Sequence, residues 1–346
     1  MTQRLGIVAI GRNEGERLRA CLRSVVGESR IVVYVDSGST DGSVAMAREM
    51  GAEVVELDLA TPFTAARARN EGFARLVKID DTIELVQFVD GDCEVVAGWL
   101  ERAVAELKRD EKLAVVCGRR RERHPQATVY NRLCDVEWDS PVGEAKSCGG
   151  DAMIRASAFR EVGGYDASVI AGEEPELCVR LRARGWTIRR IDAEMTLHDA
   201  AMTRFGQWWK RNVRAGHAAA EGAAMHGAPP ERHAVHRVRS NWAYGLVLPL
   251  LILGLAWPTR GISFALLLAY PLLAWRVARH ERHRGRAPAD ARLHGVFVAL
   301  GKLPQAIGQA RYHYGRLCGQ RSQLIEYKGA HCADLVPSPS GRRLVP

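Results

Sequence analysis

The chain has 346 residues, of which 47% are hydrophobic and 26% are charged, and it carries a net charge of +9. This composition excludes a disordered chain, a collagen-like repeat and a small disulfide scaffold, because enough apolar side chains are present to bury a core. The charge is divided unevenly, since residues 1–200 carry a net −6 and residues 201–346 a net +15. The two parts of the chain therefore need separate explanations.

Short apolar runs alternate with helical patterns along the first half of the chain. In chain order, strands are expected at residues 5–10, 31–35, 53–57, 85–89, 113–117 and 186–197. Apolar residues between them recur at helical spacing, for example Leu18, Cys21, Leu22 and Val25. The alternation predicts an α/β fold with a mostly parallel sheet covered by helices on both faces. Ligands of such sheets bind beyond the carboxyl ends of the strands.

The second half of the chain differs in composition. The domain with the predicted α/β fold is expected at 1–222, and a basic linker at 223–240 follows it. Beyond the linker we expect a helical hairpin at 241–279, a basic amphipathic helical region at 280–325 and a disordered tail at 326–346. Each arm of the hairpin has about 14 to 17 uncharged residues, or roughly 21 to 25 Å of helix, which is short for a hydrocarbon core of about 30 Å.

The hairpin allows two interpretations. It could be buried within a soluble protein, or it could enter a membrane, either spanning or re-entrant. We favour the membrane, because arginines gather at both ends of the hairpin and only Arg260 lies at its turn. By the positive-inside rule, both ends then face the cytoplasm, at an anionic inner membrane. Nucleic-acid binding is not expected, because the basic residues flank an apolar segment rather than interleave with aromatic ones.

Eight cysteines are scattered singly along the chain, without the spacing of a zinc site. We interpret them as small buried hydrophobic residues in a reducing compartment. The first ten residues contain too short an apolar run for a secretory signal and lead directly into a strand-like segment. Together these features predict that the front half stays in the cytoplasm.

Acidic residues stand where predicted strands end. Asp90-Gly91-Asp92 follows the strand at 85–89, and Asp36 follows the strand at 31–35. Two carboxylates so close repel each other, and a divalent cation that holds a diphosphate would relieve this repulsion. A solvated turn is the alternative for Asp90-Gly91-Asp92, and a helix-capping turn is the alternative for Asp36.

Several motifs occur in a characteristic order. They are Ile10-Gly-Arg-Asn13-Glu14, Val35-Asp36-Ser-Gly-Ser-Thr-Asp41-Gly42, Ala68-Arg69-Asn70-Glu-Gly72, Phe88-Val-Asp90-Gly-Asp92, Gly149-Gly150-Asp151, Val162-Gly-Gly-Tyr165-Asp166 and Gly172-Glu173-Glu174-Pro-Glu176-Leu177. In this order, over residues 4 to 215, the sequence resembles glycosyltransferase family 2, whose members have the GT-A nucleotide-diphospho-sugar transferase fold.

The resemblance implies roles for individual residues. Asp36 would contact the nucleotide base, and Arg69, rather than the competing Arg67, would line the nucleotide pocket. Asp90 and Asp92 would hold the diphosphate through Mn²⁺ or Mg²⁺. Further residues of the nucleotide-sugar site would be Arg12, Asn13, Glu14 and Gly91.

The acceptor side of the site is also implied by the resemblance. Glu174 matches the position of the general base, with Glu173 and Glu176 as alternatives, and an acidic first helical turn is the structural alternative for all three. His198 resembles a late histidine that completes the metal shell in several GT-A enzymes. Asp151, Trp138, Trp208 and Trp209 would border the acceptor, although the tryptophan pair could instead sit at a bilayer interface.

The sequence thus predicts an inverting, metal-dependent glycosyltransferase that moves a sugar from a nucleotide-diphospho sugar to a lipid-linked or envelope-polysaccharide acceptor at the cytoplasmic membrane face. A sugar-phosphate nucleotidyltransferase is disfavoured, because Gly11-Arg-Asn-Glu14 stands where its Gly-rich phosphate loop is expected. A non-catalytic sugar-nucleotide-binding protein is disfavoured, because binding alone would need no base at Glu174.

Overall fold

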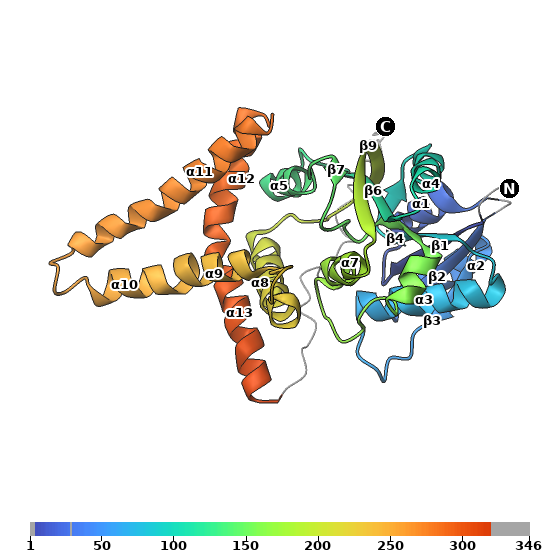
Figure 1. Ribbon diagram of the computed structural model, residues 1–346, viewed down its shortest axis with the longest axis horizontal. Helices are drawn as coiled ribbons and strands as arrows, with labels where there is room; N and C mark the ends of the chain where they lie inside the picture. Colours follow the sequence, from blue (N-terminus) through green and yellow to red (C-terminus); the bar gives the residue numbers. More distant parts are fainter. Residues whose placement is uncertain (1–3, 28–29, 320–346) are drawn as a thin grey trace, which may run out of the picture.

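A computed structural model describes residues 4–27 and 30–319 of the chain. It contains an α/β domain, on the right in Figure 1, and a group of long helices on the left. The predicted tail at 326–346, the end of the predicted helical region at 320–325 and Cys332 lie outside the described residues.

The α/β domain is built on one mixed sheet with the strand order β3-β2-β1-β4-β8-β6-β9-β5, and β7 pairs with β9. The strands are β1 (Leu5–Gly11), β2 (Ile31–Asp36), β3 (Glu53–Glu56), β4 (Leu85–Asp90), β5 (Cys93–Val95), β6 (Leu113–Glu122), β7 (Gly143–Glu144), β8 (Ala152–Arg155) and β9 (Thr187–His198). The strands β1 to β4 are mutually parallel, as the sequence predicts.

The mixed character of the sheet comes from strands that the sequence analysis missed. β8 lies antiparallel between β4 and β6, and the short β5 and β7 both pair antiparallel with β9. These strands have two to four residues, which is too short for a periodic pattern to stand out. The fold is therefore α/β with a mixed, mostly parallel sheet.

Helices cover both faces of this sheet, with α1 and α4 on one side and α3 and α7 on the other (Figure 1). The helices of this domain are α1 (Glu16–Val25), α2 (Ser43–Glu49), α3 (Ala65–Ile79), α4 (Trp99–Arg109), α5 (Val129–Glu137), α6 (Ala156–Glu161) and α7 (Glu173–Ala183). Because both faces are covered, Ile7, Val8 and Ala9 of β1 are all fully buried, and the strand is a continuous apolar run.

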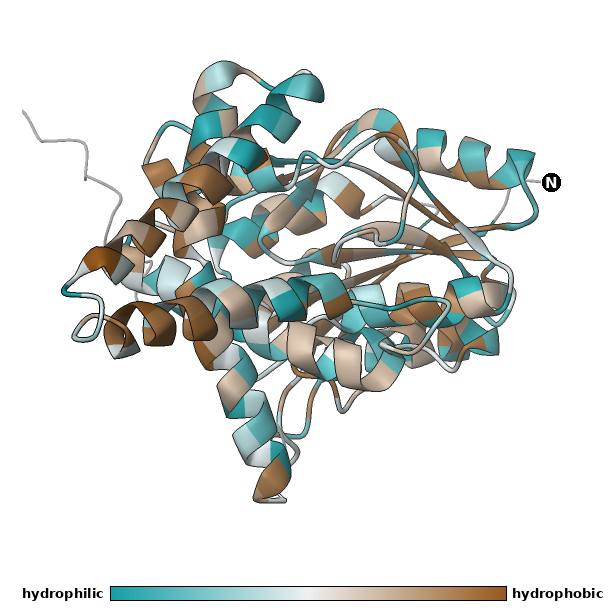
Figure 2. Cartoon of the chain, turned by 60° about the vertical axis from the view of Figure 1, so that its left-hand side comes forward, coloured by the Kyte–Doolittle hydropathy of each residue, from teal (hydrophilic) through white to brown (hydrophobic). Residues whose placement is uncertain are grey.

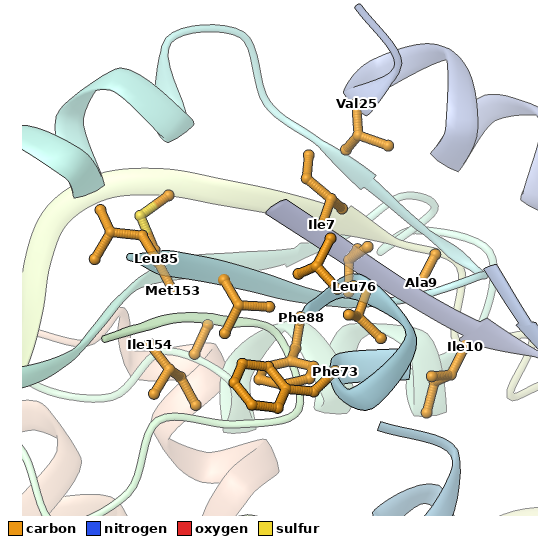
Figure 3. Close-up of a cluster of buried hydrophobic side chains, with 14 of the residues drawn as sticks. Ile7, Ala9, Ile10, Val25, Phe73, Leu76, Leu85, Phe88, Met153 and Ile154 are labelled. Atoms are coloured by element: carbon orange, nitrogen blue, oxygen red, sulfur yellow. The ribbon is translucent and has the colours of Figure 1, made fainter. Parts of the chain in front are cut away.

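The core lies between the central strands and these helices. Figure 3 shows side chains of β1, β4, β8 and α3 gathered in one cluster, including Ile7, Leu76, Phe88 and Ile154. The ring of Phe88 packs edge-on against Tyr165, at a centroid distance of 5.5 Å. The core thereby reaches the loop that follows α6 and anchors the strand ends where the predicted ligand residues lie.

The C-terminal part of the described chain is helical. Its α-helices are α8 (Phe205–His226), α9 (Val235–Trp242), α10 (Leu248–Gly254), α11 (Ala269–His283), α12 (Pro288–Leu300) and α13 (Lys302–Leu317). We expected a basic linker at residues 223–240. Much of this range is helical instead, because α8 extends to His226 and α9 begins at Val235. A π-helical turn, Ala243–Val247, joins α9 to α10, and a 3₁₀ helix, Ile262–Leu268, leads into α11.

Close helix crossings tie this part together. A Cβ atom at Gly216 of α8 would lie 2.0 Å from the carbonyl oxygen of Gln305, and one at Gly308 of α13 would lie 1.9 Å from that of Val213. Only glycine permits such an approach, so α8 and α13 cross backbone to backbone. A buried hydrogen bond of 2.8 Å from Asn241 to Gln309 connects α9 to α13.

Two arms project away from the α/β domain and meet at the turn between α10 and the 3₁₀ helix (Figure 1). The Tyr270 hydroxyl donates to the Tyr244 carbonyl at 2.6 Å, and the Ser263 hydroxyl donates to the Ile252 carbonyl at 2.8 Å, so the arms are joined along their length. Figure 2 shows hydrophobic residues along both arms. Many of them are exposed, among them Leu250, Leu253, Trp257, Ile262 and Leu268.

The cysteines follow the sequence analysis in part. Six of the seven described cysteines are buried thiols that form no disulfide within residues 4–27 and 30–319, namely Cys21, Cys93, Cys117, Cys134, Cys148 and Cys178. Cys318 is exposed near the end of α13, so the expectation of burial is wrong for this residue.

Candidate active site

The Asp90-Gly91-Asp92 turn lies at the carboxyl edge of the sheet. Ile10 of β1 is in register with Asp90 of β4, and the Gly91 amide donates to the Ile10 carbonyl at 2.7 Å. This hydrogen bond fixes the turn against the neighbouring strand. Asp92 is 5% exposed, whereas Asp90 is partly accessible. The backbone that carries the two carboxylates is therefore held at the carboxyl end of β4, where the sequence analysis expects ligand-binding residues.

Arg69 of α3 faces this turn. Its guanidinium donates to Asp90 Oδ1 and to Glu173 Oε1, both at 2.7 Å, and the residue is 2% exposed. Burial acts to lower the pKa of Arg69, but the charges of Asp90 and Glu173 outweigh it and raise this pKa, so the side chain stays charged. Arg67 points elsewhere, because its guanidinium donates to the carbonyl oxygens of Asp58 and Thr61. Of the two arginines, Arg69 is therefore the one that lies at the Asp90-Gly91-Asp92 turn.

Asn70, the neighbour of Arg69, fixes a second loop beside the site. Its side chain donates to the Tyr165 carbonyl at 2.7 Å and accepts from the Tyr165 amide at 2.9 Å. Gly164 has a φ of +72°, and a Cβ atom there would lie 2.7 Å from Asn70 Oδ1, so the Gly-Gly-Tyr sequence suits this loop. The Tyr165 ring lies 5.5 Å from the Arg69 guanidinium and forms a cation–π contact.

Asp151 supports Asp90 from behind. Its Oδ1 accepts the Asp90 amide at 3.0 Å, while its Oδ2 accepts the Thr196 hydroxyl at 2.9 Å and pairs with Arg120 at 3.1 Å. Although burial acts to raise the pKa of Asp151, Arg120 and His198 lower it. The residue is fully buried, so the prediction that Asp151 borders the acceptor is wrong. It positions the backbone of the Asp90 turn instead.

Arg120 is a site residue that the sequence analysis missed. It lies within Arg119-Arg120-Arg121 on β6, where side chains alternate between the two faces of the sheet. Arg119 and Arg121 both pair with Asp135, whereas Arg120 pairs with Asp151. Strand alternation could have indicated that the middle arginine faces the opposite side, but the full length of β6 was not predicted.

His198 is brought to Asp92 by strand pairing. Because β5 and β9 are antiparallel with Cys93 opposite His198, the imidazole Nε2 lies 3.2 Å from Asp92 Oδ2, although the two residues are 106 positions apart. The Trp138 ring stacks on the imidazole at a centroid distance of 4.6 Å and an interplanar angle of 4°. His198 Nδ1 is buried and has no hydrogen-bond partner among residues 4–27 and 30–319.

These side chains fit a divalent metal ion. Ligand atoms of Asp92, Cys93 and His198 lie within 4.8 Å of one another, and so do those of Asp90, Cys93 and Asp151. Burial raises the pKa of the Cys93 thiol well above its ordinary value, which keeps it protonated and unsuited to bind a metal. The Asp92 carboxylate and the His198 imidazole, with the Asp90 carboxylate two positions away on the same turn, supply oxygen and nitrogen donors that suit Mn²⁺.

The predicted nucleotide-base side of the site lies at the ends of β1 and β2. Asp36 is 2% exposed and accepts hydrogen bonds from the Tyr34 hydroxyl at 2.9 Å and from the amides of Gly38 and Ser39 at 2.9 and 2.8 Å. Asp36 therefore shapes its own turn, as the capping alternative expects. Asn13 joins this turn to the first loop, because its side chain accepts the Thr40 amide at 2.7 Å.

The other first-loop residues lie nearby. Glu14 pairs with Arg17 at 2.7 Å within the same loop and helix, and Arg12 is exposed. A Cβ atom at Gly91 would lie 3.5 Å from Glu14 Cγ, so this loop adjoins the Asp90-Gly91-Asp92 turn. The first loop and the turn after β2 thus form one polar rim beside the two carboxylates.

The three candidate bases have different surroundings. Glu173 is paired with Arg69, and this charge lowers the pKa of Glu173 although burial acts to raise it. Glu176 binds Arg180 through both carboxylate oxygens, at 2.7 and 2.6 Å, and its Oε1 also contacts His226 at 2.9 Å. Glu174 accepts the Cys148 amide and, at 3.3 Å, the Cys178 thiol, both at Oε1.

The tryptophan pair on α8 does not act as a unit. Trp208 is 1% exposed, and its ring lies 5.2 Å from that of Phe297 on α12, in a cluster with Leu133 and Met202. Its predicted contact with an acceptor or a bilayer is therefore wrong, because the side chain is core. Trp209 is half-buried and packs at the edge of the same cluster.

Comparison with known proteins identifies the family of the α/β domain. Residues 7–162 match the family "Glycosyl transferase family 2". Residues 7–162 therefore form a glycosyltransferase family 2 domain. This match spans β1 to α6 and so includes Asp36, Arg69, Asp90, Asp92 and Asp151.

Two curated relatives of this family 2 domain are glycosyltransferases. The pre-mycofactocin glycosyltransferase of Mycobacterium tuberculosis is 30% identical over 230 residues, which cover 62% of this chain and 46% of the relative. Glycosyltransferase AglE of Haloferax volcanii is 23% identical over 219 residues, which cover 59% of this chain and 69% of AglE. The chain thus spans about half the length of the first relative.

A solved structure shares the GT-A fold with this chain. It is the mannosyltransferase PcManGT of Pyrobaculum calidifontis in complex with GDP-Man and Mn²⁺, with a TM-score of 0.55 and 18% sequence identity. The match covers 89% of this chain and 88% of PcManGT. It therefore includes helices beyond the family 2 domain.

Proposed function

We propose that the protein is an inverting, metal-dependent glycosyltransferase that uses a nucleotide-diphospho sugar. The observation that supports this most strongly is the contact between Asp92 and His198 beside Asp90 at one strand edge, with Arg69 and Asp151 holding Asp90. Asp90, Asp92 and His198 would hold Mn²⁺ or Mg²⁺. A bound ion of this kind neutralises the charge that develops on a leaving diphosphate. The complex of PcManGT with GDP-Man and Mn²⁺ supports the proposal that this chain uses a nucleotide-diphospho sugar and a divalent metal ion.

The first-loop residues and Asp36 would border the nucleotide, next to the metal ligands. Arg12, Asn13 and Glu14 lie on the same rim as Asp36, and Asn13 bonds the turn that Asp36 shapes. Arg69 would fix Asp90 in position, because its buried guanidinium pairs with that carboxylate at 2.7 Å. Together these residues bind and orient the donor.

Glu174 is the base that we propose for the acceptor hydroxyl. Glu173 is a poor proton acceptor, since Arg69 stabilises its ionised form, and both oxygens of Glu176 are occupied by Arg180. Glu174 adjoins the Cys148-Gly149-Gly150 loop through the Cys148 amide, and Gly150 lies next to Asp90 and Arg69. The Cys148-Gly149-Gly150 loop therefore lies between the Glu174 carboxylate and the proposed metal ligand Asp90. In an inverting reaction it would take the proton as the hydroxyl attacks the sugar.

A donor screen by nucleotide release tests this chemistry. The full chain is incubated with nucleotide-diphospho sugars, with Mn²⁺ or with a chelator, beside Asp92→Ala, Glu174→Gln and the control Glu176→Gln. Asp92→Ala should lose activity, and Glu174→Gln should lose about 10²- to 10⁴-fold in kcat while still binding donor. Full activity of Asp92→Ala in chelator would exclude the metal mechanism. Normal turnover by Glu174→Gln would move the base to another residue.

We further propose that the two arms attach the enzyme to the cytoplasmic face of an anionic inner membrane, where a lipid-linked or envelope-polysaccharide acceptor would be presented. Trp257 is 93% exposed, Ile262 76% and Leu268 69%, and a monomer rarely exposes so large an apolar patch to water. Ile262–His283 is long and apolar enough to cross a membrane. Basic residues lie at the base of both arms, namely Arg232, Arg237, Arg239, Arg276, Arg279, Arg282, Arg284 and Arg286.

Vesicle sedimentation tests the attachment. The wild-type chain should pellet with vesicles that contain anionic lipid, and a Leu253→Glu/Trp257→Glu double variant should stay in the supernatant. Leu59→Glu is the matched control, because Leu59 is 70% exposed on the α/β domain, and it should pellet like the wild type. Sedimentation of the double variant with the vesicles would contradict the proposal.

A further inference from the structure

Trp138 occupies an unusual position between two parts of the candidate site. One face of the indole stacks on the His198 imidazole at 4.6 Å, and the Arg120 guanidinium lies 5.6 Å from the Trp138 ring. His198 faces Asp92, while Arg120 pairs with Asp151, which holds the Asp90 amide. Trp138 thus connects the supports of both carboxylates in the Asp90-Gly91-Asp92 turn.

The backbone around Trp138 is held by the C-terminal helices. Trp138 caps the carboxyl end of α5, where the last carbonyl groups of a helix lack partners within the helix. Arg286, from the corner between α11 and α12, donates to the carbonyl of Val136 and, at 3.0 Å, to that of Asp139. These two carbonyls flank Trp138 on both sides, and a cation is stabilising at a helix carboxyl end.

Arg286 is itself fixed by a buried acid. Its Nε donates to Glu281 Oε2 at 2.8 Å, and Glu281 is only 4% exposed at the end of α11. The Arg286 side chain is 10% exposed, so the contact is shielded from solvent. A second contact between α5 and α12, from Arg132 to Asp290 at 2.7 Å, lies at the other end of α5 and away from Trp138.

We propose that Trp138 is a positioning residue for the metal ligand His198, and that Arg286 couples the C-terminal helices to the metal site by fixing Trp138. This inference rests on the proposed metal-dependent function. The indole restricts the rotation of the imidazole, so that Nε2 stays directed at Asp92. Residues that orient a metal-bound histidine from outside the ligand shell typically change metal affinity by about 10- to 100-fold when they are replaced.

The test is direct Mn²⁺ binding by the full chain, measured by electron paramagnetic resonance in the absence of any sugar donor. Trp138→Leu should weaken Mn²⁺ binding about tenfold or more. Trp138→Phe, which keeps a stacking ring, should restore most of the affinity. Arg286→Ala should weaken binding in the same direction, whereas Arg132→Ala, the control at the same helix interface, should match the wild type.

The outcomes separate this inference from the proposed function. Failure of the wild-type chain to bind Mn²⁺ would overturn the metal-dependent function, and the inference with it. Wild-type binding with an unchanged dissociation constant in Trp138→Leu would overturn the inference alone. Weakened binding in Trp138→Leu but not in a folded Arg286→Ala would overturn the coupling to the C-terminal helices. If Arg286→Ala does not fold, as judged by circular dichroism, Glu281→Gln replaces it in the same comparison.

Discussion

Two regions of this molecule reverse the usual distribution of residues between interior and surface. At the strand ends of the α/β domain, charged residues are buried, as Arg69 at 2% exposed and Asp151 at 0% illustrate. Along the two arms, large apolar residues are exposed, as Trp257 at 93% illustrates. Charged residues are rarely buried without a partner, and large apolar patches are rarely left in water.

The two reversals are stabilised differently. The buried charges have charged or hydrogen-bonding partners within the same domain, for example Asp90 and Glu173 beside Arg69 and backbone amides beside Asp36. The exposed apolar residues of the arms have no such partner among the described residues, and the membrane that we propose would supply one. The catalytic region should therefore be sensitive to single substitutions in solution, whereas the exposed face of the arms should tolerate them.

The largest expected effect on stability is at Arg69. Arg69→Met removes the buried cation that pairs with the partly buried carboxylates of Asp90 and Glu173, and we expect the free energy of unfolding to fall by about 3 kcal/mol. Arg67→Met is the control, since Arg67 only donates to loop carbonyls, and it should cost about 1 kcal/mol. Chemical denaturation measures both values. Equal losses in the two variants would contradict the special role of the Arg69 ion pairs.

Adjacent residues of α10 allow a test within one arm. Ile252 is 3% exposed and Leu253 is 67% exposed. Ile252→Ala should lower the free energy of unfolding by about 2–5 kcal/mol, because it removes buried apolar volume. Leu253→Ala should change it by no more than about 0.5 kcal/mol. Thermal unfolding without lipid distinguishes these cases, and a large loss in Leu253→Ala would mean that this face is covered by protein.

Two glycines of α13 probe the helix crossing. Gly308→Ala places a methyl group against the Val213 carbonyl, so we expect a loss of about 1–3 kcal/mol in the free energy of unfolding. Gly315→Ala lies in open space on the same helix and should raise helix stability by up to about 1 kcal/mol. The sign of the shift in Tm, opposite in the two variants, is the measurement. A shift of the same sign in both would argue against the close crossing of α8 and α13.

His217 on α8 gives the helices a dependence on pH. Burial lowers the pKa of His217 to about 4, whereas an unfolded histidine titrates near 6.5. Above pH 6.5 the imidazole is neutral in both states and has no effect. As the pH falls from 6.5 towards 4, the unfolded state takes up the proton first, so stability falls.

The effect of His217 is the smallest of the set. At pH 5 it should amount to about 1 kcal/mol after allowance for partial solvent screening. His217→Gln should therefore lose less stability than the wild type between pH 7 and pH 5, as measured by denaturation at the two pH values. The same pH dependence in both proteins would exclude His217 as its source.

Much of the α/β domain could be predicted from the sequence. Continuous apolar runs placed β1, β2, β4 and the start of β6, and they showed that Asp36 and Asp90 follow strands. Such local patterns depend on residues within one element and its turn, so they are readable without tertiary contacts. The helices of the second half were expected from its composition. The helical structure within residues 223–240 was not predicted, because these helical segments are stabilised by packing on other helices.

The order of its motifs by itself indicated the family of the α/β domain and the strand edge where we propose the site. Only the tertiary structure decided between residues of one type. Arg69, not Arg67, reaches Asp90, and Trp208 is core while Trp138 stacks on His198. The reason is that these contacts join residues far apart in the chain, such as Arg69 and Glu173, which are 104 positions apart. Side-chain direction at such contacts depends on strand register and on helix packing, which no local pattern encodes.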